Sequence, residues 1–247
     1  MTTISASREP TVSSSRVRLG AVSLALSGIL FVLYPLLRPY SDETSLQGAA
    51  AFASPLWIVA HLLGVMGFIF VALGLLALSS VLQHTVARRL ASPALILAWL
   101  GVGFILPYYG AEMFGLRALG QEALRQHSPA LLSLADAIRL GPGAIVFGVG
   151  LLLLAVGAIL VAIAIWRSGT LSRWSGLPFA LGFVLYLPQF FGTPPVRVVH
   201  GFLVALGCLW IAWGMLKGQR LPSQFLPGQA SESSKHMRDK DAHQISV

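Results

Sequence analysis

Long apolar stretches separated by short polar segments dominate this chain of 247 residues. Each stretch approaches the roughly 20 apolar residues that a helix needs to cross the hydrocarbon of a membrane. No stretch alternates apolar and polar residues as the strands of a membrane barrel do. The pattern therefore predicts an all-α integral membrane protein, a bundle of six transmembrane helices. The six expected spans are residues 19–37, 56–82, 91–111, 142–166, 174–192 and 196–216.

Composition supports lipid as the main solvent of the chain. Hydrophobic residues make up 55% and charged residues 11%, and the mean hydropathy is +0.76. A soluble domain has about 25% charged residues, so too few polar residues are present to cover a water-facing surface. The net charge of +8 would indicate nucleic acid in a soluble protein. In a membrane chain it reflects topology instead, and we expect membrane lipids rather than nucleic acid as partners.

The polar ends of the chain are expected to be flexible tails. Residues 1–18 and 218–247 contain too few apolar residues to fold alone, and they flank a membrane domain of residues 19–217. The first apolar stretch follows arginines, as in a signal peptide. It is longer than the usual apolar region of such a peptide and ends in "YPLLRPYS", without a small-x-small cleavage pattern. We therefore expect a retained first span.

The distribution of basic residues orients the predicted spans. Twelve of the 17 lysines and arginines fall in the segments on the same side as the N-terminus, including the short loops "QHTVARRLAS" and "WRSGTLSRW". Lysine and arginine accumulate on the cytoplasmic side of membrane proteins. Both termini are thus expected in the cytoplasm, and the loop of residues 112–141 on the outer side. The predicted location is the cytoplasmic (inner) membrane of a bacterium.

A proline recurs near the outward end of each odd-numbered span, at Pro35, Pro107 and Pro188. The even-numbered spans are richer in glycine and alanine. This recurrence is compatible with three tandem helical hairpins. It is equally compatible with chance similarity among apolar segments of narrow composition, so both interpretations stay open.

The long outer loop, residues 112–141, is expected to form two short amphipathic helices at the membrane interface. Ser128 is a candidate N-cap, and Pro129 occupies the first helical position after it. Such helices can cover a cavity between the spans or simply connect them along the lipid surface. The pattern does not choose between these roles.

The stretch "ILPYYGAEMF" has two readings. Tyrosines favour the headgroup level, so Tyr34 and Tyr108 are typical of an interfacial belt. Pro107, however, is expected to bend the helix and to turn Glu112 over the bundle. Arg197 is the cation predicted to pair with that carboxylate.

Polar side chains expected within the spans gather in one outer layer, and intramembrane polar groups are costly and often functional. We expect His61 and His200 to face the bundle interior. Three roles compete for this layer: hydrogen bonding between helices, a pocket for a small amphipathic ligand, or a metal or haem site formed by the two histidines and Glu112. The candidate ligand-binding residues are His61, Tyr108, Glu112, Gln189, Arg197 and His200.

Missing motifs narrow the function further. The sequence has no G-x-x-x-x-G-K-[ST] loop for nucleotides and no G-x-S-x-G elbow of a serine hydrolase. No carboxylate stands in the middle of a predicted span, which disfavours ordinary ion-coupled transport. Binding, and passage, of a small amphipathic or lipid-like ligand is the favoured function. The alternatives are an intramembrane enzyme that uses a divalent metal or haem and a structural subunit with a membrane-protein partner.

Overall fold

The computed structural model describes residues 13–218, and all of its regular elements are helical. Residues 1–12 and 219–247, which contain most of both predicted tails, lie outside the described residues. The α-helices are α1 (Ser14–Leu37), α2 (Leu46–Ala53), α3 (Pro55–Leu82), α4 (Arg88–Gly110), α5 (Leu116–Arg125), α6 (Leu134–Arg139), α7 (Pro142–Ser168), α8 (Gly176–Val184) and α9 (Pro194–Gly218). The π-helical η1 (Ala111–Gly115) and the 3-10 helices η2 (Pro129–Ser133) and η3 (Pro188–Phe191) complete the described part.

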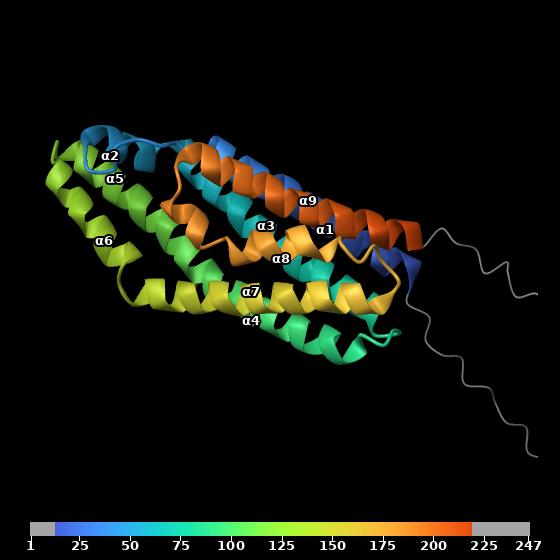
Figure 1. The fold of residues 1–247 in the computed structure, drawn as a ribbon. Coiled ribbons are helices and arrows are strands. Elements are labelled where there is room, and N and C mark those ends of the chain that lie inside the picture. Colours follow the sequence, from blue (N-terminus) through green and yellow to red (C-terminus); the bar gives the residue numbers. More distant parts are fainter. Residues whose placement is uncertain (1–12, 219–247) are drawn as a thin grey trace, which may run out of the picture.

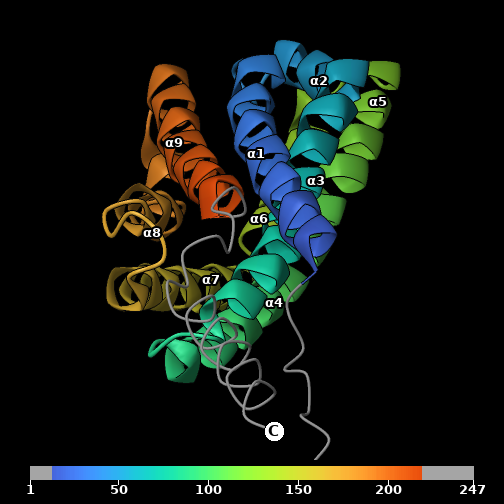
Figure 2. The ribbon, with the colours of Figure 1, turned by 90° about the vertical axis from the view of Figure 1, so that its right-hand side faces the viewer.

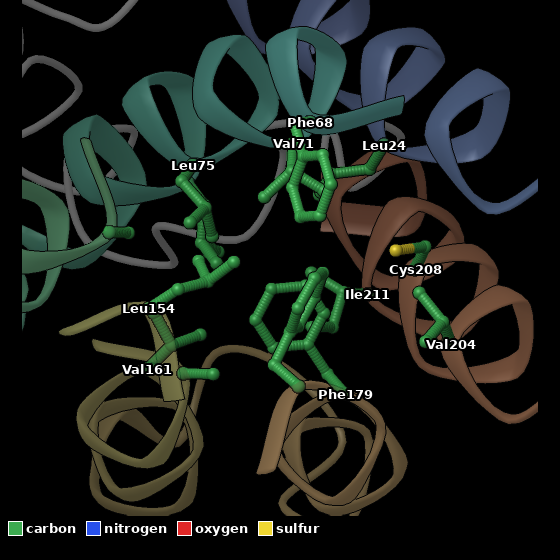
Figure 3. Packing of buried hydrophobic residues seen from close by; sticks show 14 of the residues in the cluster. Leu24, Phe68, Val71, Leu75, Leu154, Val161, Phe179, Val204, Cys208 and Ile211 are labelled. Atoms are coloured by element: carbon green, nitrogen blue, oxygen red, sulfur yellow. The ribbon is translucent and has the colours of Figure 1, made fainter. Parts of the chain in front are cut away.

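Six of these helices form a ring around a common core (Figure 2). Each contacts the next in the order α1, α3, α4, α7, α8 and α9, and α9 packs back against α1. Side chains from α3, α7, α8 and α9 meet inside the ring, among them Val71, Leu154, Phe179 and Ile211 (Figure 3). The ring follows the order of the chain, so its first and last members are neighbours.

The two ends of the ring differ in what they carry (Figure 1). One end, called the terminal end here, holds the start of α1, the end of α9 and the connections from α3 to α4 and from α7 to α8. The opposite end carries α2, α5 and α6 and is called the cavity end. The short helices of the predicted outer loop thus lie at the end away from both described termini.

Five helical segments of the described part are long and apolar enough to cross a membrane. Large apolar side chains such as Ile96, Leu152 and Phe202 are exposed on the outside of the ring. Soluble proteins rarely expose continuous apolar surfaces of this kind. The exposed faces of these helices therefore suit hydrocarbon rather than water.

The predicted span of residues 174–192 is not one long helix. The α8 helix has nine residues and ends at Val184, and η3 follows from Pro188. A proline ring clashes with the carbonyl four residues earlier, which here belongs to Val184, so Pro188 explains where α8 stops. The segment nevertheless leads from the terminal end, where α7 finishes, to the cavity end, where α9 begins (Figure 1).

Several helix boundaries follow from local chemistry. The hydroxyl of Ser54 accepts a hydrogen bond from the backbone N–H of Leu56 and caps α3, with Pro55 at its first position. Gly169, with φ of +68°, ends α7 in the left-handed conformation that glycine adopts without strain. The α1 helix starts at Ser14, so the prediction that residues 14–18 belong to a flexible tail is wrong.

The α4 helix ends at Gly110, within one residue of the predicted end of the third span, but the helical segment continues beyond it. The α4 helix passes directly into η1 and α5, giving one segment from Arg88 to Arg125 of 38 residues. At 1.5 Å per residue such a segment is about 57 Å long, well beyond the roughly 30 Å of hydrocarbon. Its second half therefore extends past the ring and covers the cavity end.

Glycines allow close contact between α4 and α7. A Cβ atom built on Gly101 would lie 2.7 Å from the backbone oxygen of Gly150 and 2.7 Å from the backbone nitrogen of Leu154. Both obstacles are main-chain atoms, which cannot rotate away. Small residues at helix crossings are typical of packing inside membranes, where the backbones approach closely.

Candidate functional site

A cavity of about 790 Å³ lies at the cavity end of the ring. Its walls come from α1, the segment before α2, α3, α4, η1, α6, α7, η3 and α9. The lining residues are Tyr34, Arg38, Tyr40, Ser41, Asp42, Glu43, His61, Tyr108, Tyr109, Glu112, Arg139, Leu140, Ala144, Phe147, Gly148, Leu187, Phe190, Phe191, Pro194 and Arg197. Four of the six predicted ligand-binding residues are therefore brought to one cavity: His61, Tyr108, Glu112 and Arg197.

A chain of charged side chains runs along one wall. The Arg139 guanidinium donates from Nε to Glu112 Oε1 at 2.6 Å and from Nη2 to Glu112 Oε2 at 3.3 Å. Arg139 Nη1 also bonds Glu43, whose other oxygen accepts from Arg38 Nη2 at 3.0 Å. Two carboxylates and two guanidiniums thus neutralise each other in an alternating row.

The electrostatic environment of Arg139 follows from this row. Burial alone would lower the pKa of its guanidinium, but the hydrogen bonds and charges of Glu112 and Glu43 outweigh burial and raise that pKa. The fork of the guanidinium matches a carboxylate in two places, which makes the contact with Glu112 directional as well as charged. Arg139 therefore stays cationic and fixes the position of both carboxylates.

His61 is buried, with 2% of its surface exposed, and both of its ring nitrogens face a polar atom. Nδ1 lies 2.7 Å from the carbonyl oxygen of Trp57, and because a carbonyl can only accept, Nδ1 carries the hydrogen. Nε2 lies 3.7 Å from Glu112 Oε2. Trp57 in turn donates from its indole to the backbone oxygen of Glu112 at 2.9 Å. These contacts join α3 to η1.

Aromatic side chains form the floor and one side of the cavity. The hydroxyls of Tyr109 and Tyr186 are 2.7 Å apart, deep between α4 and the segment after α8. Tyr108 stacks on Phe147 of α7, with ring centroids 4.2 Å apart, and its hydroxyl donates to the backbone oxygen of Arg139 at 3.4 Å. An interfacial belt alone does not account for Tyr109, because this residue is fully enclosed in the ring.

Gln189 and His200 do not line the main cavity. They border a hollow of about 10 Å³, which shares Tyr34 and Arg197 with the main cavity. His200 Nε2 is 2.7 Å from the carbonyl oxygen of Gly182 and therefore donates to it. The prediction that both histidines face the interior is confirmed, since His61 and His200 are both buried. His200 acts as a link between α9 and α8.

The predicted metal or haem set of His61, His200 and Glu112 is not brought together. Glu112 faces His61, whereas His200 bonds the backbone carbonyl of Gly182 and does not line the main cavity. Across residues 13–218, no group of three or more His, Cys, Asp or Glu side chains is placed to hold a metal ion. The donor set that the sequence suggested therefore does not fit a metal.

The predicted pair of Glu112 with Arg197 is wrong. Arg197 donates from Nη2 to the carbonyl of Phe190 at 2.7 Å and from Nε to the carbonyl of Gly192 at 3.3 Å. One carbonyl belongs to η3 and the other to the link between η3 and α9, so both acceptors come from the residues that immediately precede Arg197 in the chain. Glu112 is held by Arg139 instead, from the far end of the outer loop.

Three charged residues of the site were missed in the sequence: Arg38, Glu43 and Arg139. They stand in predicted loops, where charged residues are common, and their partners are 5 to 96 positions away in the chain. One available signal was their place next to span ends on the same predicted side. That signal gives no pairing, because the pairing depends on how the loop folds over the ring.

A second part of the cavity lining is apolar. It is formed by one face of α7, with Ala144, Phe147 and Gly148, and by Leu187 and the phenylalanines of η3. A Cβ atom built on Gly148 would meet no other atom within 4 Å. This face of α7 therefore borders open space rather than a neighbouring helix.

The described part of the chain is all-helical, with five helical segments long and apolar enough to cross a membrane and a mixed polar and apolar cavity at one end of its helical ring. Comparisons of the chain with protein-family models, with curated proteins and with solved structures found no match.

Proposed function

We propose that this protein binds a small amphipathic or lipid-like ligand in the cavity, and that the ligand passes between the membrane and this site. One observation carries the proposal: a cavity of about 790 Å³ is lined both by a charged row and by an apolar face. Ligand sites are typically concave spaces of about 300–1,000 Å³ with mostly apolar walls and a few fixed polar groups. An amphipathic molecule matches both walls at once.

The surroundings of the apolar wall support entry from lipid. Phe191, which lines the cavity, is 88% exposed, and Leu187 is partly exposed beside it. Leu140, which lines the cavity just before the start of α7, is also largely exposed. The apolar side of the cavity is thus bordered by side chains that face the outside of the ring, where hydrocarbon is the expected solvent.

We assign His61 a positioning role. Its Nδ1 donates to the Trp57 carbonyl at 2.7 Å, which fixes the ring on α3. Its Nε2 makes no hydrogen bond to the described residues and lies 3.7 Å from Glu112 Oε2 at the cavity wall. Together with the Trp57 indole, which donates to the backbone oxygen of Glu112, the ring keeps α3 against η1.

We further propose that the cavity end faces away from the cytoplasm. Among the described residues, the terminal end has seven lysines and arginines and no acidic residue, whereas the cavity end has five arginines and five acidic residues. The net charge of the terminal end is therefore the larger one, as expected for a cytoplasmic face. Both termini would lie in the cytoplasm of a bacterial cell, with the protein in its inner membrane.

A fusion experiment tests this topology. Alkaline phosphatase, which is active only outside the cytoplasm, should be inactive when fused after Val247 and active when inserted after His127 at the exposed end of α5. Green fluorescent protein, which does not fluoresce when exported unfolded, serves as the reciprocal reporter. Phosphatase activity from the Val247 fusion would contradict the proposed orientation.

We also propose that residues 176–191 complete a sixth crossing in two short pieces. The support is that α7 and α9 both run from the cavity end to the terminal end, so the chain between them has to return. Successive antiparallel pairs α1 with α3, α4 with α7, and α8 with α9 are in contact. This arrangement is compatible with three tandem hairpins.

Filling the cavity should abolish ligand binding without unfolding the protein. Because a side chain on Gly148 enters open space beside Phe147, Gly148→Leu should weaken binding at least tenfold while the melting temperature stays within about 2 °C of the parent. The measurement is saturation binding of tritiated hexadecanol, hexadecanoate and hexadecyltrimethylammonium to the full-length protein in lipid nanodiscs.

Gly103→Leu is the matched control. Gly103 also meets no atom within 4 Å, and it lies in α4 on the outside of the ring rather than in the cavity wall. It should leave binding unchanged. Equal affinities of the parent and the Gly148→Leu variant for all three amphiphiles would refute the proposed function.

A further inference from the structure

We infer that the ligand is a single-chain amphiphile with an anionic head group, and that Arg197 is the residue that binds this head. The inference rests on the proposed function and specifies the ligand class of the same cavity. Its basis is that one guanidinium of the cavity is not neutralised by the charged row.

Arg197 is the arginine of the cavity lining that the charged row does not neutralise. Glu112 and Glu43 are both bound to Arg139, and Glu43 is also bound to Arg38. Arg197 has no ion pair with any carboxylate in the described segment, residues 13–218, and its protein partners are two backbone carbonyls. A cation next to a low-dielectric wall is stabilised by an anion, and an incoming carboxylate or phosphate supplies one.

The guanidinium of Arg197 is held in place before any ligand arrives. Its Nε and Nη2 atoms donate to carbonyls at 3.3 and 2.7 Å, and these bonds fix the plane of the group. Nη1 makes no hydrogen bond to the described residues. A head group that accepts from Nη1 therefore meets a donor whose orientation is already set, and this lowers the entropic cost of binding.

Tyr40 supplies a second donor beside Arg197. The Arg197 guanidinium carbon lies 5.7 Å from the centre of the Tyr40 ring, and that of Arg38 lies 4.9 Å from the same centre. The Tyr40 hydroxyl is buried and has no hydrogen-bond partner among the residues described. Buried polar atoms are nearly always paired, so a hydroxyl left over next to a cavity is a marked feature.

Asp42 is the one lining carboxylate outside the charged row, and it does not cancel Arg197. Its side chain is exposed and accepts hydrogen bonds from the hydroxyl and the backbone N–H of Thr44. These two bonds lower the pKa of the Asp42 carboxyl, and the bond from the hydroxyl has the larger effect. Asp42 is thus satisfied locally and solvated at the rim. The beginning of α9 at Pro194, which lines the cavity next to Arg197, adds the partial positive charge of a helix N-terminus.

The apolar part of the cavity lining can accommodate the hydrocarbon tail of the ligand. Leu187, Phe190 and Phe191 precede Arg197 in the chain and line the same cavity. A head bound at Arg197 therefore places its tail along η3 and the facing side of α7. The cavity volume of about 790 Å³ is within the range that holds one drug-sized ligand, which suits one acyl chain rather than a lipid with two.

Competition binding tests the head group. Tritiated hexadecanoate is bound to the full-length protein in nanodiscs of zwitterionic lipid and displaced by hexadecanoate, hexadecyl phosphate, hexadecanol or hexadecyltrimethylammonium, which share one tail. We expect both anions to compete at least tenfold better than the alcohol, because hydrogen bonds to charged groups contribute more than neutral ones. Acetate and inorganic phosphate, which lack the tail, should not compete at the same concentrations.

Variants then assign the effect to Arg197. Arg197→Gln should reduce the preference for hexadecanoate over hexadecanol to about twofold or less. Arg117→Gln is the matched control, because Arg117 also lies at the cavity end and donates to a backbone carbonyl, that of Ser54, without lining the cavity. It should keep the full preference. Tyr40→Phe, which preserves the ring, should lower the preference about threefold and tests the same site if Arg197→Gln does not fold.

The outcomes separate this inference from the proposed function. If the alcohol competes as well as the anions, or the ammonium compound competes better, the ligand does not have an anionic head group. The proposed function still holds in that case, provided that Gly148→Leu weakens binding. An unchanged anion preference in both Arg197→Gln and Tyr40→Phe would overturn the assignment of Arg197. If inorganic phosphate displaces all of the bound hexadecanoate, the site binds a free anion rather than an amphiphile.

Discussion

Replacing Arg139 by alanine should lower the melting temperature of the protein in detergent by about 7 °C. The substitution leaves Glu112 and Glu43 without their shared partner, and Glu112 is buried. Breaking a buried ion pair costs about 3–5 kcal/mol. The side chains here are partly exposed, so a loss of about 2–3 kcal/mol is the expected size, and about 3 °C corresponds to each kcal/mol in a chain of this length.

Two comparisons make this result specific. Arg125→Ala removes an exposed pair with Glu122, in which the arginine side chain is 70% exposed, and should change stability by no more than about 0.5 kcal/mol. Combining Arg139→Ala with Glu112→Gln should cost less than the sum of the single losses, because the glutamine leaves no unpaired charge. Simple additivity of the two substitutions would contradict a coupled pair.

The second large effect is expected at the crossing of α4 and α7. Gly101→Ala should destabilise the protein by about 3 kcal/mol, since the new Cβ atom would lie 2.7 Å from main-chain atoms of Gly150 and Leu154. Overpacking a tight core costs about 1–3 kcal/mol, and the upper end applies where no side chain can rotate away. Two helices must separate along their whole contact to admit one methyl group.

Gly103 provides a control two residues along the same helix. A Cβ atom at this position meets nothing within 4 Å, and alanine is the better helix former by up to about 1 kcal/mol. Gly103→Ala should therefore leave the melting temperature unchanged or raise it slightly. If both alanine variants melt at the same temperature as the parent, α4 and α7 do not pack as closely as described.

Hydropathy was sufficient to predict most of the membrane helices, because helix length and apolar content determine that signal. The predicted spans 56–82 and 142–166 correspond to Pro55–Leu82 and Pro142–Ser168, within two residues at each end. The span 174–192 is also mostly apolar but contains Pro188, and its helix ends at Val184, four residues before this proline. Hydropathy does not register this local constraint.

The candidate site was predictable in its residues but not in its pairing. His61, Tyr108, Glu112 and Arg197 could be assigned to one layer from their depth in the expected spans, and they line one cavity. The partner of Glu112 could not be predicted, since Arg139 reaches it only after the outer loop folds back over the ring. The separation of His200 from His61 depends on which way each helix is rotated, which periodicity does not specify for helices apolar on all sides.

The π-helical turn at η1 constrains how the length of this chain can vary during evolution. Each residue of an α-helix rotates the chain by about 100°, so losing one residue between Tyr109 and Gly120 would turn α5 by that angle relative to α4. The close contact of Gly120 with the backbone of α2 would then be lost, because a Cβ atom there already lies 2.6 Å from the oxygen of Ala49. Single-residue insertions and deletions are therefore excluded between α4 and α5. They are tolerated about two turns later, in the connection from α5 to η2, where residues 126 and 127 are exposed.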